Sequence, residues 1–364
     1  MSLIINWSGS QRIFLLKRHL DIIIRYLTFK KVKNILIALN DFQRRKEKPL
    51  ASPLYIKVEP TRICNLRCTG CVQSEEGYKT QPGIRTQFKI ENFKKVIDAL
   101  HKTLLGISFS YYGEPLLGRS LMKMVKYAHD KGVGTMFPTN FSVKISEDKA
   151  KEIVNSGLDM MMISLDGASK ETYSKYRIGG NFNLILENVK KIHQAKIDLK
   201  SKSPHLRWKF IVFDHNKHET ELAKQSYKKL GFDSLSLEGD MYNKESKEKI
   251  RKSKYLRNIR EKKLACFWVW FTLIIEYNGD VSPCCGIDDL VTIDTFDLGN
   301  VYETEVLDIW TGNSYQKLRK GFKKKESNDT LHSTCQACIG VKQSFIEENK
   351  APAPQDLYDF EVLK

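Results

Sequence analysis

The chain of 364 residues contains eight cysteines, and all of them fall in two groups. The first group is Cys64, Cys68 and Cys71, which lie close together on one stretch directly after the β-rich run 54–58. Three thiolates on one loop can bind three irons of a 4Fe-4S cluster and leave the fourth iron open, whereas a zinc site would more naturally close with a fourth cysteine or histidine. The spacing therefore favours an open iron-sulfur cluster over a zinc site or unrelated cysteines.

The second group lies in the C-terminal part of the chain and comprises Cys266, Cys284, Cys285, Cys335 and Cys338. Four thiolates suit a closed metal site, either a second 4Fe-4S cluster or a zinc ion. The sequence shows no signal-peptide pattern and no apolar run of 18 residues, so we expect a cytoplasmic protein without a spanning helix. In that reducing compartment, clustered cysteines are metal ligands or reactive thiols rather than disulfides.

Short β-rich runs alternate with amphipathic helical patterns between residue 54 and about residue 240. This alternation predicts a parallel sheet with crossover helices. The units are too few for a closed eight-stranded barrel, so we expect an open partial barrel or a doubly wound sheet, with the ligand site at the carboxyl edge of the strands. The predicted strands are 54–58, 106–111, 134–137, 160–165, 207–213 and 234–237, and the predicted helices are 90–104, 121–130, 147–155, 184–195 and 219–230. In the C-terminal part, 267–271 and 272–277 are predicted strands, and a helix is expected over 306–322.

The Cys-x3-Cys-x2-Cys loop at the end of the first predicted strand resembles the signature of the radical S-adenosylmethionine (radical SAM) superfamily. The resemblance implies an α/β fold, a partial (β/α)6 TIM-like barrel, with a 4Fe-4S cluster whose open iron binds S-adenosylmethionine. One electron from an external donor such as flavodoxin or ferredoxin would cleave this cofactor and release a 5′-deoxyadenosyl radical. That radical would abstract a hydrogen atom from the substrate.

The second predicted strand ends in Tyr112-Gly113-Glu114-Pro115, which resembles the GGEP motif of the family. The resemblance implies that Gly113 and Glu114 receive the amino group of S-adenosylmethionine, since glycine allows close backbone approach and a carboxylate matches an ammonium group. One departure is Gly70, because the residue before the third cysteine is often aromatic in the family and packs near the adenine. The motif therefore does not identify the residue that holds the adenine.

The next two strand ends carry the candidate cofactor contacts Asn140, Ser164 and Asp166, which the resemblance places near the ribose and the methionine carboxylate. Arg177 lies in a segment that recurs in relatives, and its planar guanidinium suits a carboxylate. Two alternatives stay open here. Asp166 could instead cap a turn, and Arg177 could be a surface or helix-start arginine.

The C-terminal stretch resembles the SPASM/twitch extension of radical SAM enzymes through Cys266-x17-Cys284 and a later Cys-x2-Cys pair. The resemblance is to the single-cluster form found in 2-deoxy-scyllo-inosamine dehydrogenase-type enzymes. It implies one auxiliary 4Fe-4S cluster with four ligands, which are Cys266, Cys284, Cys335 and Cys338. Cys285 is left over as an alternative ligand, a small buried residue or a thiol able to donate a hydrogen atom.

About half of the net charge of +17 lies near the N-terminus, where residues 1–50 hold eleven basic and three acidic residues. Residues 11–28 and 29–45 predict two amphipathic helices that combine a wide apolar face with these basic residues. Such helices are typical of peripheral contact with anionic lipid, and packing of both helices on the barrel is the alternative. Nucleic-acid binding is disfavoured, because the basic residues lie beside apolar stripes and no RNA-binding motif is present.

The chain divides into four expected parts: a basic helical extension (1–50), the partial barrel (51–240), a charged linker helix (241–265) and a small α+β iron-sulfur domain (266–364). A content of 41% hydrophobic residues excludes wholesale disorder. Because four protein thiolates leave no iron open, we expect the auxiliary cluster to accept an electron. The predicted function is therefore dehydrogenation of a carbohydrate-type or lipid-linked small molecule. The alternatives are ribosomal-peptide maturation, epimerisation with Cys285 as hydrogen donor, and a non-enzymatic zinc- or cluster-binding protein.

Overall fold

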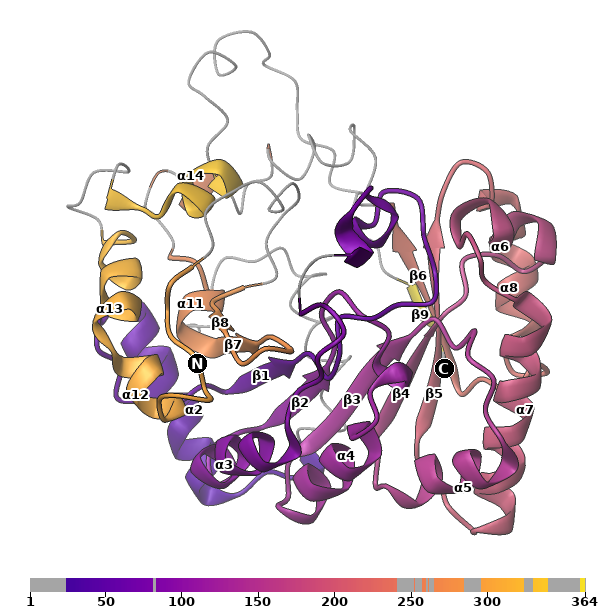
Figure 1. The fold of residues 1–364 in the computed structure, drawn as a ribbon, viewed down its shortest axis with the longest axis horizontal. Helices are drawn as coiled ribbons and strands as arrows, with labels where there is room; N and C mark the ends of the chain where they lie inside the picture. The colour runs from indigo at the N-terminus through magenta and orange to yellow at the C-terminus, as the bar shows by residue number, and fades with distance from the viewer. Residues whose placement is uncertain are drawn as a thin grey trace, which may run out of the picture.

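The computed structural model describes residues 24–80, 83–240, 265–284, 296–323, 330–339 and 361–363, with the short pieces 252, 257–259 and 261. Its centre is one sheet, in which the described strands run in the order β8-β7-β1-β2-β3-β4-β5-β6-β9. Strands β1 to β6 are parallel and adjacent in chain order, and the sheet ends at β8 and β9 instead of closing (Figure 1). The expected open partial barrel is confirmed. These six strands are Tyr55–Val58, Gly106–Phe109, Gly134–Thr139, Met160–Ser164, His205–Val212 and Ser234–Gly239.

Helices connect the parallel strands and cover the outer face of the sheet (Figure 1). Two of them begin where a polar side chain caps the first turn, since Ser146 Oγ accepts from Lys149 N and Asn181 Oδ1 accepts from Leu184 N. The helices are α3 (Ile90–Leu100), α4 (Leu121–Asp130), α5 (Glu147–Asn155), α6 (Lys170–Tyr176), α7 (Phe182–Asp198) and α8 (Thr220–Ser226). Four short 3-10 turns join them, η1 (Val72–Ser74), η2 (Tyr78–Thr80), η3 (Pro115–Leu117) and η4 (Lys217–Glu219).

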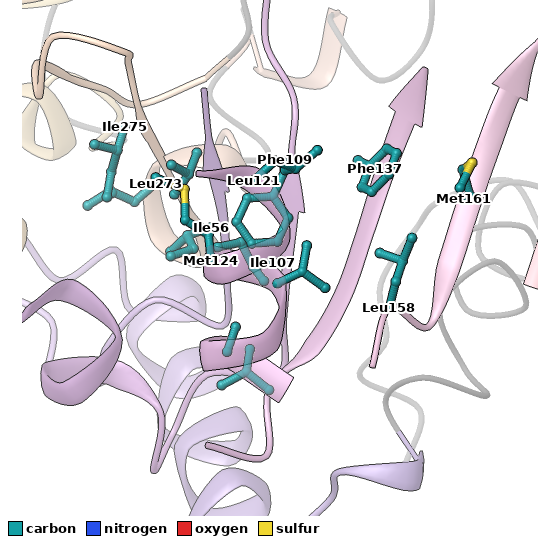
Figure 2. Close-up of a cluster of buried hydrophobic side chains, with 14 of the residues drawn as sticks. Ile56, Ile107, Phe109, Leu121, Met124, Phe137, Leu158, Met161, Leu273 and Ile275 are labelled. Carbon is teal, nitrogen blue, oxygen red and sulfur yellow. The ribbon is translucent and has the colours of Figure 1, made fainter. Parts of the chain in front are cut away.

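The main hydrophobic core lies between the sheet and these helices (Figure 2). Successive side chains of a strand face opposite sides of the sheet, so alternate residues enter this core. Ile56, Ile107 and Phe137 are examples, and each is fully buried. A separate cluster on the other face joins Met136, Met160 and Met162 to Tyr26 and Tyr55. That other face also carries polar side chains, among them the Lys209–Glu238 ion pair of β5 and β6 at 3.0 Å, so polar groups lie along the strands as well as at their ends.

The C-terminal region shares the same sheet. Strand β7 (Thr272–Ile275) pairs in parallel with β1, and Tyr55 lies opposite Thr272. Strand β8 (Val281–Ser282) pairs antiparallel with β7 across a turn that contains Gly279, whose φ of 92° suits glycine. The last described strand, β9 (Glu361–Leu363), pairs antiparallel with β6.

Two predictions for the C-terminal region differ from the structure. The aromatic run 267–271 reads as a strand, but it forms one helical turn, α11 (Trp268–Phe271). This turn buries Trp270 against Phe42, and its indole N–H donates to Lys46 O, so tertiary packing overrides the β propensity of aromatic residues. The helix expected over 306–322 is broken at Gly312 into α12 (Val306–Thr311) and α13 (Asn313–Lys320). Helix α14 (Ser333–Ile339) follows.

The second N-terminal helix is present as α2 (Phe29–Gln43), which begins where Thr28 Oγ1 accepts from Lys31 N. The helix expected over 11–28 lies mostly outside the described residues. Arg25 pairs with Asp159 at 2.6 Å, which ties the chain before α2 to the residue before β4. No helix of the described residues has both the length and the apolar character needed to cross a membrane.

Candidate functional site

The three-cysteine loop follows β1 and lies at the carboxyl edge of the sheet. Its cysteines, Cys64, Cys68 and Cys71, pack in one cluster with Leu66, Tyr176 and Phe213. Burial raises the pKa of the Cys64 thiol to about 12, and the charges of Glu114, Cys68 and Cys71 add to the shift. Burial also raises the pKa of Cys68. Both shifts disfavour ionisation of Cys64 and Cys68, which a bound iron-sulfur cluster would reverse because its ligands are thiolates.

Two predicted cofactor residues contact these thiols. Asn140 Nδ2 lies 3.8 Å from Cys64 Sγ and also donates to Asn65 Oδ1 at 3.0 Å. Arg177 Nη1 lies 3.7 Å from Cys68 Sγ, and its Nε donates to Asp166 Oδ2 at 2.6 Å. The ends of β3, β4 and α6 therefore bring Asn140, Asp166 and Arg177 to the cysteine loop. Ser164, the last residue of β4, is buried on the same edge.

Glu114 is buried and makes three hydrogen bonds. Its carboxylate accepts from Thr139 Oγ1 at 2.6 Å, from Asn140 N at 2.7 Å and from Leu116 N at 3.1 Å. Burial raises the pKa of Glu114, although these hydrogen bonds oppose the shift. In this structure the side chain ties the end of β2 to the end of β3, and its contact with the cofactor amino group stays a prediction.

Gly113 is needed for close packing of two backbones. A Cβ at this position would lie 1.9 Å from Thr61 O, far inside van der Waals contact. The next residue continues the contact, since Glu114 N donates to Ile63 O at 2.8 Å. A side chain at position 113 would therefore push the cysteine loop away from β2.

Gly70 departs from the family pattern for a conformational reason. Its φ is +73°, in the left-handed region that side chains other than glycine rarely adopt. Aromatic rings reach the loop from elsewhere, because the tilted rings of Tyr176 and Phe213, 4.4 Å apart between centroids, pack against the cysteines. Tyr176 begins the segment that recurs in relatives, although that segment was expected to contribute only Arg177, and no motif pointed to Phe213.

Arg62 forms an ion-pair network that the sequence did not reveal. Its Nη2 lies 2.8 Å from Glu59 Oε2 and 2.5 Å from Glu276 Oε2, so it joins the cysteine loop to the residue after β7. Burial alone would lower the pKa of Arg62, but the two carboxylates raise it. Glu276 also accepts from Ser282 Oγ at 2.7 Å. The spacing of Glu59 and Arg62 could have suggested a local pair, whereas nothing in the sequence pointed to Glu276.

Glu59 extends this network to the second strand end. Its Oε1 accepts from Tyr112 N at 3.0 Å, and its Oε2 accepts from Tyr277 N at 3.3 Å. The Tyr112 ring lies 4.1 Å from the ring of Tyr111, and Arg62 lies 5.4 Å from the Tyr112 ring. The network thus connects the ends of β1, β2 and β7.

The auxiliary cysteines come from three separate elements. Cys266 precedes α11, Cys284 follows β8, and Cys335 and Cys338 lie one turn apart on α14. Burial raises the pKa of Cys335 well above its usual range, and the charges of the other three thiols add to the shift. The three elements therefore bring Cys266, Cys284 and Cys338 close enough to Cys335 for their charges to act on it. Cys285 lies outside the described residues.

Both sets of cysteines have the donor chemistry of 4Fe-4S ligands. Among the residues that the structure describes, no three histidine, cysteine, aspartate or glutamate side chains meet around a single ion position. A 4Fe-4S cluster does not require such a meeting, because each thiolate binds its own iron at a separate corner of the cluster.

Two family models match this chain. Residues 58–212 match the Radical SAM superfamily, and residues 266–339 match SPASM, an iron-sulfur cluster-binding domain. Together with the open α/β sheet, these matches show a radical SAM domain followed by a C-terminal SPASM domain. The domains imply 4Fe-4S clusters and S-adenosylmethionine as the cofactors, which confirms that expectation.

The chain is similar to several known proteins at low identity. Mycofactocin maturase MftC of Mycolicibacterium smegmatis is 30% identical over 149 residues, which are 41% of this chain and 36% of MftC. The chain thus spans well under two thirds of this relative. Streptococcus suis SuiB bound to precursor peptide SuiA has a TM-score of 0.59 and 14% identity, over 94% of this chain and 87% of that one. Native anSMEcpe with bound AdoMet and Cp18Cys peptide has a TM-score of 0.50 and 18% identity, over 83% of this chain and 92% of that one. Both structures support the fold.

Proposed function

We propose that this protein is a radical SAM oxidoreductase that uses its SPASM cluster as an electron acceptor. When bound, the cysteine-loop cluster and S-adenosylmethionine supply reductive cleavage to a 5′-deoxyadenosyl radical, which abstracts hydrogen from substrate. The observation that carries the proposal is the contact of Asn140 and Arg177 with thiols of a loop that has only three cysteines. That arrangement leaves one iron position for the cofactor and surrounds it with polar side chains.

The residues around the loop have distinct proposed roles. Asn140 and Arg177 donate hydrogen bonds toward sulfur, which stabilises negative charge on the ligands and orients them. Asp166 holds the Arg177 guanidinium in place and accepts from Ile211 N at 2.7 Å, so Asp166 positions that side chain. Gly113, Glu114 and Ser164 contribute the strand ends that face the methionine part and the ribose. Tyr176 and Phe213 are the proposed aromatic contacts of the adenine.

The proposed substrate is a carbohydrate-type or lipid-linked small molecule that undergoes dehydrogenation. Support comes from the four auxiliary cysteines, because a cluster with four protein thiolates has no open iron for substrate and can take an electron from a substrate radical. An external donor such as flavodoxin or ferredoxin would supply the electron that starts the reaction. The proposal places the enzyme in the reducing cytoplasm, with peripheral membrane contact through residues 1–50.

Peptide modification is the second candidate function. Support comes from the similar proteins described above. One is a maturase, and two are structures with a bound peptide. In that case the same radical chemistry would act on a side chain of a ribosomal peptide. The two candidates differ only in substrate, so a substrate panel separates them.

The test is anaerobic reconstitution with iron and sulfide counting, followed by measurement of 5′-deoxyadenosine in the presence of a reduced flavodoxin or ferredoxin. We expect two clusters per chain and reductive cleavage of S-adenosylmethionine, with product formed from either alcohol-bearing small molecules or peptides. Zinc in place of iron, or a fully loaded protein without cofactor cleavage, would indicate the non-enzymatic alternative. Inversion of a stereocentre without net oxidation would indicate an epimerase.

A further inference from the structure

Helix α2 buries three polar side chains, beside Ala38 and Phe42, and exposes large apolar ones. Lys31, Asn34 and Asp41 are 2%, 5% and 0% exposed, whereas Phe29 and Leu36 are 84% and 62% exposed. These two sets lie on opposite sides of the helix, because residues three or four apart share a face. A surface helix normally buries its large apolar side chains and exposes its polar ones, so the exposure of Phe29 and Leu36 is unusual.

Specific hydrogen bonds fix α2 in this orientation. Lys31 Nζ donates to Gly132 O at 2.6 Å, and Asn34 exchanges two hydrogen bonds of 3.1 Å with the backbone of Ser52. Asp41 Oδ2 accepts from Leu50 N at 2.7 Å and from Ala51 N at 2.9 Å. Turning the helix to bury Phe29 and Leu36 would break all of these contacts, and buried polar groups are costly to leave without partners. The exposed apolar face is therefore built into the fold.

We define the α2 ridge as Phe29, Val32 and Leu36, which share the outward face of the helix. Ile24 and Leu27 directly precede it and are 60% and 43% exposed. Most of the large apolar side chains exposed in the described part of the chain lie between residues 24 and 50. Basic residues border the ridge, since Lys30, Lys33 and Arg44 are also exposed. An apolar patch with basic borders marks an interaction surface.

We infer that the α2 ridge inserts into the surface of an anionic lipid bilayer. Apolar side chains next to lysines and arginines match the two components of such a surface, acyl chains below and negative headgroups above. A second copy of the chain is a poorer partner, because pairing two ridges would bring their basic borders together. Residues 1–23 are also poorer partners, because they carry three basic residues against one acidic residue.

The ridge lies at the opposite end of the sheet from the cysteine loop. Lys31 and Asn34 contact Gly132 and Ser52, which precede β3 and β1, whereas the cysteine loop follows β1. If the protein binds lipid through the ridge, the carboxyl ends of its parallel strands, where the cysteine loop lies, would therefore point away from the lipid. This inference deepens the peripheral-contact part of the proposed function, on which it rests, and names the lipid class and the surface.

The experiment is vesicle co-sedimentation of the reconstituted full chain. Vesicles of phosphatidylcholine with phosphatidylglycerol are compared with vesicles of phosphatidylcholine alone. The ridge variant is Phe29→Ser with Leu36→Ser, and the matched control is Ile197→Ser with Leu222→Ser, whose side chains are 58% and 52% exposed. We expect binding of the wild type only to the anionic vesicles, about tenfold weaker binding of the ridge variant, and unchanged binding of the control.

Equal binding of the ridge and control variants would overturn the inference, and so would a wild type that binds no vesicles. A wild-type dimer that the ridge variant converts to a monomer would assign the surface to a second copy instead. A variant with Lys30→Glu and Lys33→Glu tests the same surface without touching its apolar residues, and it should also bind about tenfold more weakly. Cleavage of S-adenosylmethionine by each variant is measured in parallel. A variant that loses vesicle binding but keeps cofactor cleavage shows that the lipid surface and the radical SAM activity are separate.

Discussion

The two cysteine sites are built in different ways. The radical SAM loop lies on one short stretch after β1, and it is held by Asn140 after β3, by Arg177 after α6 and by the backbone contact at Gly113 after β2. The SPASM cysteines lie before α11, after β8 and on α14, three segments that come together only in the folded chain. The first site is thus formed at the edge of the sheet itself. The second site belongs to a region that joins the sheet where β7 pairs with β1. Each site should therefore respond differently to mutation.

The largest expected effect is that of Cys68→Ala. It removes one of the three loop thiolates, so the cluster that binds S-adenosylmethionine should be lost and 5′-deoxyadenosine formation should fall to background. Iron content should fall by about half, because the SPASM cluster keeps its four ligands. Cofactor cleavage at the wild-type rate in this variant would contradict the assignment of Cys68 as a ligand.

The double variant Cys335→Ala with Cys338→Ala should separate the two sites. We expect S-adenosylmethionine cleavage to persist, because the cysteine loop is intact, while oxidised product is abolished because the electron acceptor is missing. The measurement is the ratio of product to 5′-deoxyadenosine. Full product formation by this variant would disprove the electron-acceptor role.

Gly113→Ala tests the backbone contact that holds the loop against β2. The added Cβ would meet Thr61 O at 1.9 Å, and overpacking against backbone should cost about 2–4 kcal/mol of unfolding free energy. The matched control is Gly77→Ala, where φ is +75° but no atom lies within 4 Å, and its cost should be about 1 kcal/mol. Urea unfolding of both variants measures the difference, and equal losses would show that β2 and the loop separate easily.

The smallest expected effect is that of Glu276→Gln, which weakens the link between the two regions. Arg62 keeps Glu59, so the loss should be about 1–2 kcal/mol of stability. We expect nearly normal cofactor cleavage with less product per cleavage, because the Arg62 contact joins the loop to the strand that leads to Cys284. An unchanged product ratio would limit the network to a structural role.

The sequence predicted the features that depend on local pattern. The alternation of β-rich runs with amphipathic helical patterns predicted all six strands β1 to β6. The spacing of the cysteines identified both cysteine groups. The strand expected over 267–271 was wrong, because packing of Trp270 decides the local conformation there. The Arg62–Glu276 pair could not be predicted, since the two residues meet only after β7 joins β1. Periodicity likewise assigned α2 an apolar face but could not say whether that face points inward.

The pairing of β7 with β1 also has a consequence for biogenesis. Strand β1 leaves the ribosome early, yet its outer neighbour is made only when translation reaches residues 272–275. Until then one edge of β1 exposes unpaired backbone groups, and Arg62 lacks Glu276. Chains fold as their segments emerge from the N-terminus onward, so we expect the cysteine loop to mature only after the SPASM region has been synthesised. Iron delivery would then follow translation rather than accompany it.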